Sequence, residues 1–247
     1  MRSGPQRQGA SARPAPTLVW DLPTRLFHWT LLAAVVSAWV SFELAEALGD
    51  ATLKWHRVNG LLVLILVVWR LLWGIAGSST SRFASFVPGP RAVFGYLRGL
   101  IAGGGSRFLG HNPAGALMVL ALLLVLGVQG AVGLIATDDN DLVGGPLYRL
   151  VDAASNAWAA GKHAFLFNYV LLPLIMLHVA ANILYGVVKR EPLIQAMVTG
   201  RKPQGKYADA PAAEIVARPL LRAGVCLIIA VALTLGGILL IGGTLRL

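Results

Sequence analysis

Five long apolar segments dominate the sequence and constrain its fold more than any other feature. A helix that crosses a bilayer needs about 20 predominantly apolar residues, and each segment is close to that length. Only 13% of the 247 residues are charged, against about a quarter in an ordinary soluble domain, and the mean hydropathy is +0.69. We therefore expect an all-α integral membrane helix bundle. The segments run approximately over residues 26–44, 55–75, 114–136, 163–188 and 220–243.

The basic residues divide unevenly between the connections, and the formal net charge is +10. Fifteen lysines and arginines lie before or at the start of the first segment and in the second and fourth connections, whereas four lie in the first and third. Loops on the cytoplasmic side carry the excess of basic residues. We therefore predict a multi-pass protein of the bacterial inner membrane with a cytoplasmic N-terminus and a periplasmic C-terminus. Apolar runs separate the charges, so the sequence does not predict nucleic acid as a partner.

Five histidines lie in the apolar segments or at their ends, where an ionisable side chain is costly and points to function. His28 is near the cytoplasmic start of the first segment, and His56 is at the external start of the second. His163 begins the fourth segment, and His178 follows 15 residues later. This offset spans about 22 Å and four helical turns plus roughly 60°. His28 and His178 are therefore expected at one level, and His56 and His163 at another.

Each level supplies two neutral imidazoles from different helices, which suits the two axial positions of a haem iron. A bare metal ion is the competing use of paired histidines. Structural zinc sites usually have four ligands, often with Cys or carboxylate among them, and the segments lack interior carboxylates. Cys226 is the single cysteine, so iron–sulfur clusters and covalent c-type haem attachment are not expected.

Six segments of the chain form a recognisable set: VWDLPTRLFHW (19–29), WHRVNG (55–60), RLLWG (70–74), HNP (111–113), LHVA (177–180) and QAMVTGRK (195–202). Through these segments the sequence resembles the bacterial cytochrome b561 and nickel-iron hydrogenase b-type cytochrome family over about residues 19–202. The resemblance implies a four-helix core with two haem b groups that exchanges electrons with quinone or a redox partner protein, either hydrogenase-like or a cytochrome c. It also implies His28, His56, His163 and His178 as the haem iron ligands.

Three further residues are candidates for the same site. Arg25 and Arg57 stand close in sequence to His28 and His56, so they either pair with haem propionates or only set the topology. His111 precedes Asn112-Pro113. It either caps the third helix or serves as a hydrogen-bond partner or proton donor for a quinone, a role that suits a histidine titrating near neutral pH.

The organisation follows from these elements. We expect a disordered cytoplasmic leader over 1–17, a cytochrome b561-like four-helix haem-binding domain over 18–202, a linker over 203–218 and an additional transmembrane helix over 219–247. Residues 146–160 are expected to form a short interfacial helix, and Pro173 is expected to kink the fourth helix.

The function that follows is an electron-transfer subunit of an oxidoreductase rather than a stand-alone enzyme. One alternative on the same fold is a superoxide:quinone oxidoreductase, with Arg57, Arg149 and Lys162 attracting the anion on the external face. The other alternative is a non-redox membrane transporter or assembly scaffold, which predicts a colourless purified protein.

Overall fold

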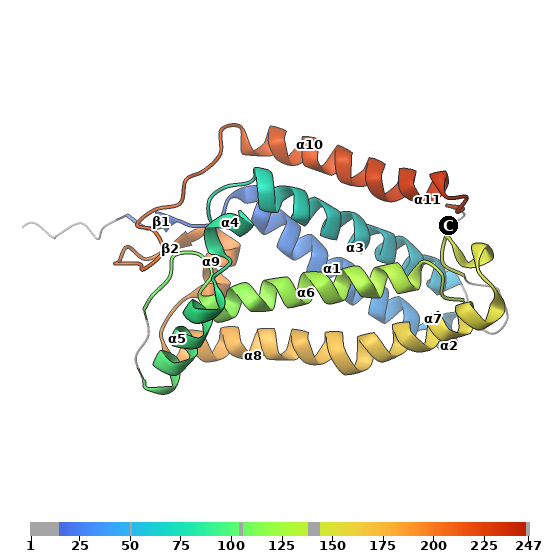
Figure 1. Ribbon diagram of the computed structural model, residues 1–247, viewed down its shortest axis with the longest axis horizontal. Helices are drawn as coiled ribbons and strands as arrows, with labels where there is room; N and C mark the ends of the chain where they lie inside the picture. Colours follow the sequence, from blue (N-terminus) through green and yellow to red (C-terminus); the bar gives the residue numbers. More distant parts are fainter. Residues whose placement is uncertain (1–14, 50, 104–105, 138–143, 246–247) are drawn as a thin grey trace, which may run out of the picture.

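The computed structural model describes residues 15–49, 51–103, 106–137 and 144–245. The first fourteen residues of the expected leader lie outside this range. Within it, five helices are long and apolar enough to cross a membrane, and they lie side by side along the long axis of the molecule (Figure 1). The predicted all-α bundle is therefore confirmed.

The five spans differ in regularity. The first three are single helices, whereas each of the last two contains a π-helical turn. Their parts are α1 (Leu22–Glu43), α3 (Ala51–Ala76), α6 (Pro113–Gly133), then α7 (Ala153–Leu166), η2 (Phe167–Leu171) and α8 (Leu172–Val188), and finally α10 (Pro219–Val231), η3 (Ala232–Gly236) and α11 (Gly237–Leu240).

Local capping sets where the first span begins. The Asp21 side chain accepts a hydrogen bond of 2.8 Å from the Thr24 backbone N–H, and Pro23 stands in the first turn. Proline suits this position because the first N–H groups of a helix have no partner within the helix. The helix therefore starts at Leu22, four residues before the predicted apolar boundary.

The fourth span begins ten residues earlier than predicted. Asp152 accepts a hydrogen bond of 2.7 Å from Ser155 N–H, and the helix continues from Ala153 to Val188. The expectation of a separate interfacial helix over 146–160 is therefore wrong. Within the described residues 144–152, the chain forms a single 3-10 turn, η1 (Tyr148–Leu150), before the span begins.

Pro173 acts on the same span through its missing N–H. Its ring would crowd the carbonyl of the residue four positions earlier in a regular α-helix. The chain widens into η2 just before it, and Leu172 N–H bonds to the Phe167 carbonyl, five residues back. Such single π-helical turns are frequent at functional sites.

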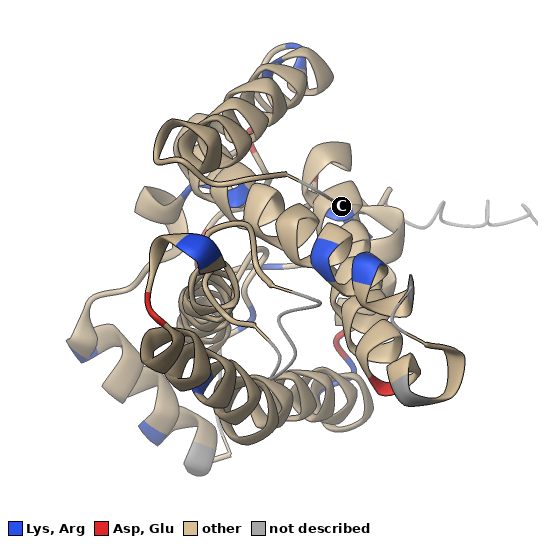
Figure 2. Ribbon diagram, turned by 90° about the vertical axis from the view of Figure 1, so that its right-hand side faces the viewer, with Lys and Arg blue, Asp and Glu red and all other residues tan. Residues whose placement is uncertain are grey.

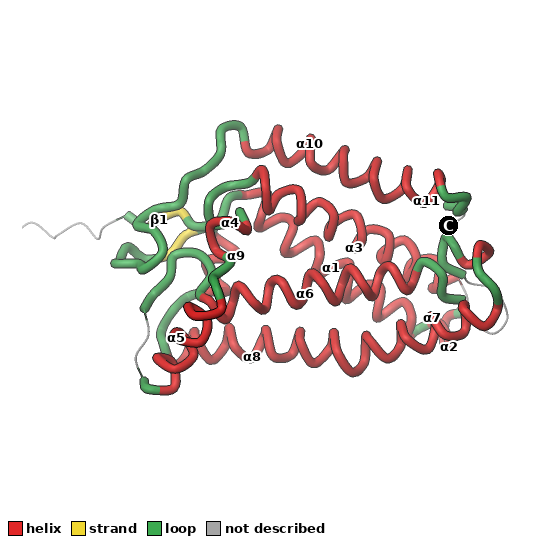
Figure 3. Tube along the Cα trace, viewed as in Figure 1, coloured by secondary structure: helices red, strands yellow, loops and turns green. Residues whose placement is uncertain are grey.

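Short elements gather at the two ends of the bundle. One end, called the basic end below, holds β1 (Thr17–Leu18) paired antiparallel with β2 (Arg201–Lys202), together with α4 (Phe83–Phe86), α5 (Pro90–Ile101) and α9 (Leu193–Thr199). The opposite end holds α2 (Ala45–Leu48), η1 and the last described residues (Figure 3). The connections rich in Lys and Arg therefore share one end, as the charge pattern predicted, while both signs of charge appear on the end seen in Figure 2.

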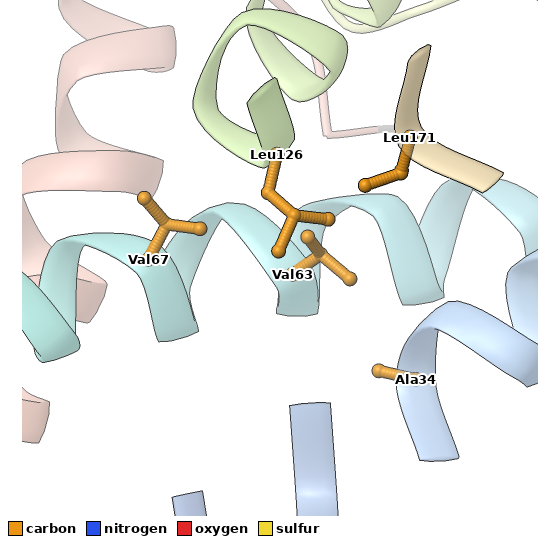
Figure 4. Close-up of a cluster of buried hydrophobic side chains, with 5 residues drawn as sticks. All are labelled: Ala34, Val63, Val67, Leu126 and Leu171. Atoms are coloured by element: carbon orange, nitrogen blue, oxygen red, sulfur yellow. The ribbon is translucent and has the colours of Figure 1, made fainter. Parts of the chain in front are cut away.

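An apolar cluster at mid-depth joins four of the spans. It consists of Ala34, Val63, Val67, Leu126 and Leu171, all at most 7% exposed, and Figure 4 shows Leu126 against Val63. Leu171 lies between the two histidines of the fourth span in sequence. The cluster therefore separates the two histidine levels and holds the helices around them.

The fifth span packs against α3. Trp69 and Trp73 of α3 form a buried cluster with Cys226 and Ala230 of α10, and the Trp69 indole N–H donates to the Ala223 carbonyl at 3.0 Å. Cys226 is thus a packing residue at a helix contact.

Candidate functional site

Two histidine pairs lie at different depths of the bundle. The ring centroids of His28 and His178, the first pair, are 6.4 Å apart. The ring centroids of His56 and His163, the second pair, are 5.9 Å apart. Both pairings are those that the sequence predicts. The π-helical turn rotates the chain less per residue than an α-helix does, so it reduces the angular offset expected between His163 and His178.

These separations fit two imidazoles on opposite sides of one metal ion. Two metal–nitrogen bonds of about 2 Å on a common axis, plus roughly 1 Å from each nitrogen to its ring centre, place the centroids about 6 Å apart. Within the described ranges, no three His, Cys, Asp or Glu side chains gather as a bare metal site would require. The donor set is thus two nitrogens per pair, which matches a haem iron whose other four ligands come from the porphyrin.

Hydrogen bonds orient the second pair. His56 Nδ1 lies 2.8 Å from the Ala38 carbonyl oxygen, and His163 Nδ1 lies 3.0 Å from the Gln129 carbonyl oxygen. A ring nitrogen that donates to a carbonyl carries the proton, so the other nitrogen, Nε2, keeps its lone pair. This is the usual arrangement of a histidine that ligates a metal.

Gln129 was not singled out from the sequence. It is a buried side chain of α6, and its amide N–H donates to the His163 carbonyl at 3.0 Å. The sequence does contain a signal for it, because Gln129 is a single polar amide side chain within an apolar run. Gly133, one turn later, leaves room for the same ring, because an added Cβ would stand 2.9 Å from His163 Cε1.

The first pair has a different environment. Asn182 donates to the His178 carbonyl at 2.7 Å, and its amide nitrogen lies 3.5 Å from His178 Nε2. His28 Nδ1 is buried and has no hydrogen-bond partner among the described residues. A buried polar atom without a partner is costly unless a ligand satisfies it.

Three arginines near the pairs have buried nitrogens that find no partner in the described part of the chain: Arg25 Nε, Arg57 Nε and Arg70 Nη1. Arg25 also donates through Nη1 to the Val198 carbonyl at 2.7 Å. Arg70 is 3% exposed, and its guanidinium lies 4.9 Å from the centre of the Phe83 ring. The unpartnered Nε atoms of Arg25 and Arg57 suit an anionic group such as a propionate, whereas Arg70 also interacts with the negative charge of Asp21.

His111 is not the cap of the third span. The Asn112 side chain accepts from Gly115 N–H at 2.8 Å and fills that role. The His111 ring instead lies 4.5 Å from the Phe86 ring and 4.8 Å from Trp20, centroid to centroid. Burial, followed by the positive charge of Arg70, lowers its pKa to about 3. His111 is thus a neutral hydrogen-bonding group rather than one that titrates near neutral pH.

His111 faces a cavity at the basic end. The cavity has a volume of about 530 Å³, within the range of small-ligand sites. Tyr96 of α5 also lines it, and its hydroxyl hydrogen-bonds to the Tyr185 hydroxyl of α8 at 2.5 Å. The remaining lining residues are Ser85, Phe86, Val87, Pro88, Ala92, Gly95, Gly99, Ser106, Phe108, Pro113 and Asp209.

Comparisons with known proteins agree with this geometry. Residues 19–200 match the family model described as prokaryotic cytochrome b561. A probable Ni/Fe-hydrogenase B-type cytochrome subunit of Rhizobium leguminosarum bv. viciae is 20% identical over 210 residues, which cover 74% of this chain and 87% of that protein. A protein of the same name from Bradyrhizobium diazoefficiens is 20% identical over 220 residues, which cover 78% of this chain and 89% of that protein. No solved structure matches the chain.

The family match spans most of the chain and includes all four paired histidines, so this membrane protein belongs to the prokaryotic cytochrome b561 family of b-type cytochromes, which act in electron transfer.

Proposed function

We propose that the chain is a di-haem b-type cytochrome that carries electrons between a redox partner protein and the quinone pool. The observation that carries the proposal is the centroid separation of 6.4 Å in the first histidine pair and 5.9 Å in the second. Each haem supplies an iron that accepts and releases one electron at a time. Two such sites at different depths provide a path through an otherwise insulating apolar core.

The protein side of each site is assigned residue by residue. His28 and His178 are the proposed axial ligands of one haem, and His56 and His163 those of the other. Arg25 and Arg57 are the proposed propionate partners, which the unpartnered buried Nε atoms support. The apolar cluster between the pairs excludes water and fixes the spacing of the helices.

The proposed quinone site is the cavity beside His111. A neutral imidazole there can donate or accept a hydrogen bond at a quinone oxygen. The partner protein is proposed to be hydrogenase-like, because both relatives carry that name; a cytochrome c is the variant.

The membrane setting and the organisation are proposed on separate grounds. The basic end is assigned to the cytoplasm of a bacterial inner membrane by its excess of Lys and Arg. The haem-binding domain is assigned to 18–202, supported by the family match over 19–200. Residues 203–218 are assigned as a linker and 219–247 as an additional transmembrane helix.

The test is the absorption spectrum of the full chain purified in detergent. We expect a red protein with a b-type reduced-minus-oxidised spectrum, whose reduced haem is oxidised on addition of decylubiquinone. A colourless protein would instead support a transporter or scaffold. Haem that is reduced by superoxide and shows no exchange with a hydrogenase or cytochrome c would support the superoxide:quinone variant.

A further inference from the structure

One face of α5 is built from small residues that leave space. Ala92, Gly95 and Gly99 recur at helical spacing and line the cavity. An added Cβ at Gly95 or Gly99 would meet nothing within 4 Å. These glycines therefore do not serve close packing of helices; they widen the cavity on the side where Tyr96 stands.

Tyr96 connects this cavity to the helix that carries His178. Its hydroxyl is 2.5 Å from the Tyr185 hydroxyl, and the two residues lie 89 positions apart in the sequence. Tyr185 follows His178 by seven residues, which is two helical turns and about 10 Å along the same face of α8. The hydroxyl pair thus bridges the space between α5 and α8 at the depth of the cavity.

An ion pair lies just beyond the pair. Glu191 follows α8, has a 12% exposed side chain, and accepts from Arg107 at 3.2 Å. Burial, the hydrogen bond to Tyr185 and the negative charge of Glu191 together raise the pKa of Tyr96. Tyr96 therefore keeps its proton at neutral pH, and a phenol can donate one hydrogen bond while it accepts another.

We propose that Tyr96 and Tyr185 form a proton relay for the quinone in the His111 cavity; this proposal rests on the proposed function. When the quinone accepts two electrons delivered from the redox partner, each carbonyl oxygen becomes a hydroxyl. At one oxygen, the Tyr96 O–H bond breaks as the new O–H bond forms, Tyr96 takes the Tyr185 proton, and water near Glu191 replaces it. The other oxygen takes its proton from water.

The test uses the full-length, haem-loaded protein with its haem reduced beforehand and then mixed with decylubiquinone. A positioned proton donor contributes about 10²–10⁴-fold to a rate. We expect Tyr96→Phe to slow the maximal rate of haem oxidation by about tenfold or more, with haem content, spectrum and half-saturating quinone concentration unchanged. Tyr185→Phe should slow it by a smaller factor and reduce the solvent deuterium isotope effect. A Tyr96→Phe rate equal to that of the parent protein overturns the relay.

Two controls separate the relay from its surroundings. Tyr148→Phe removes a phenol at the opposite end of the bundle, where the hydroxyl accepts from Arg149, and should leave the rate unchanged. Gly95→Leu fills the cavity and should raise the half-saturating quinone concentration, whereas Gly224→Leu, also in open space, should not. Unchanged kinetics in Gly95→Leu would place the quinone elsewhere and overturn the relay.

Failure of the relay is distinct from failure of the proposed function. Parent protein without haem, or with haem that quinone does not oxidise, contradicts the function itself. If quinone oxidises the haem of the parent protein, and oxidises that of Tyr96→Phe and Tyr185→Phe at the same rate, only the relay is contradicted.

Discussion

His163 and Gln129 hold each other through two hydrogen bonds, one from the His163 ring to the Gln129 backbone carbonyl and one from the Gln129 side chain to the His163 carbonyl, both at 3.0 Å. The first sets the tautomer of the imidazole, and the second ties the fourth span to α6 at the same level. The orientation of the proposed ligand is thus fixed from two elements.

Replacing Gln129 with Leu tests the side-chain half of this arrangement. The substitution keeps the backbone carbonyl that orients the ring and removes the bond between the helices. Loss of such a supporting contact typically weakens a metal site about 10–100-fold. We expect weaker retention of the haem at the second pair on dilution, with the haem at the first pair unaffected. Equal loss of both haems would contradict this assignment.

Gly133→Ala tests the space beside the same ring. The new Cβ would stand 2.9 Å from His163 Cε1, so the ring must turn or the helices must move apart. We expect a shifted midpoint potential and reduced occupancy for one of two haems, measured by redox titration. Gly127→Ala on the same helix is the matched control, since its Cβ would meet Val67 at an ordinary 3.8 Å. Identical titrations of the two variants would count against the prediction.

The stability of the basic end should depend on pH through His111. Its pKa is lowered to about 3, whereas the unfolded chain has a histidine pKa of about 6.5. Between these two pH values the unfolded state binds one proton more than the folded state does at this histidine. The contribution of His111 to the free energy of unfolding is therefore full above about pH 6.5 and is lost as the pH falls toward 3. Thermal unfolding of His111→Gln should therefore show a weaker decline between pH 7.5 and 5 than the parent chain. Parallel declines would refute the prediction.

Asp209 is predicted to stabilise the loop that precedes the third span. Its carboxylate accepts from Leu109 N–H at 2.6 Å and from Gly110 N–H at 2.8 Å. Hydrogen bonds to a charged group contribute about 1.5–3 kcal/mol each. Because Asp209 is exposed, we expect the lower part of that range for Asp209→Ala, seen as faster proteolysis of residues 106–110 with unchanged haem content. Asp209→Asn keeps one acceptor oxygen, so its rate of proteolysis should lie between those of the parent chain and Asp209→Ala. Unaltered proteolysis in Asp209→Ala would contradict the role.

The sequence predicts the spans and the levels of the histidines because both follow from local regularities. Apolar length defines a span, and helical rise converts the spacing of His163 and His178 into depth. Side-chain capping at Asp21 and Asp152 moves the helix starts beyond the apolar limits, so the hydropathy pattern places those boundaries wrongly.

Contacts between distant segments lie beyond such local rules. The apolar pattern predicts the second and third spans, but it does not reveal that α5 forms between them. Tyr96 and Tyr185 carry no shared motif, and only the tertiary fold brings their hydroxyls together. Likewise, the enclosure of His111 by Trp20 and Phe86 lowers a pKa that the sequence leaves at its ordinary value.

The most direct test of the two-pair arrangement is the haem content of four single variants, His28→Ala, His178→Ala, His56→Ala and His163→Ala, measured as the pyridine haemochrome per chain. We predict two haems in the parent chain and one in each variant. His28→Ala and His178→Ala should lose the spectrum of one haem, and His56→Ala and His163→Ala should lose the spectrum of the other haem. A parent chain with no haem, or variants whose losses group in any other way, would contradict the two-pair arrangement.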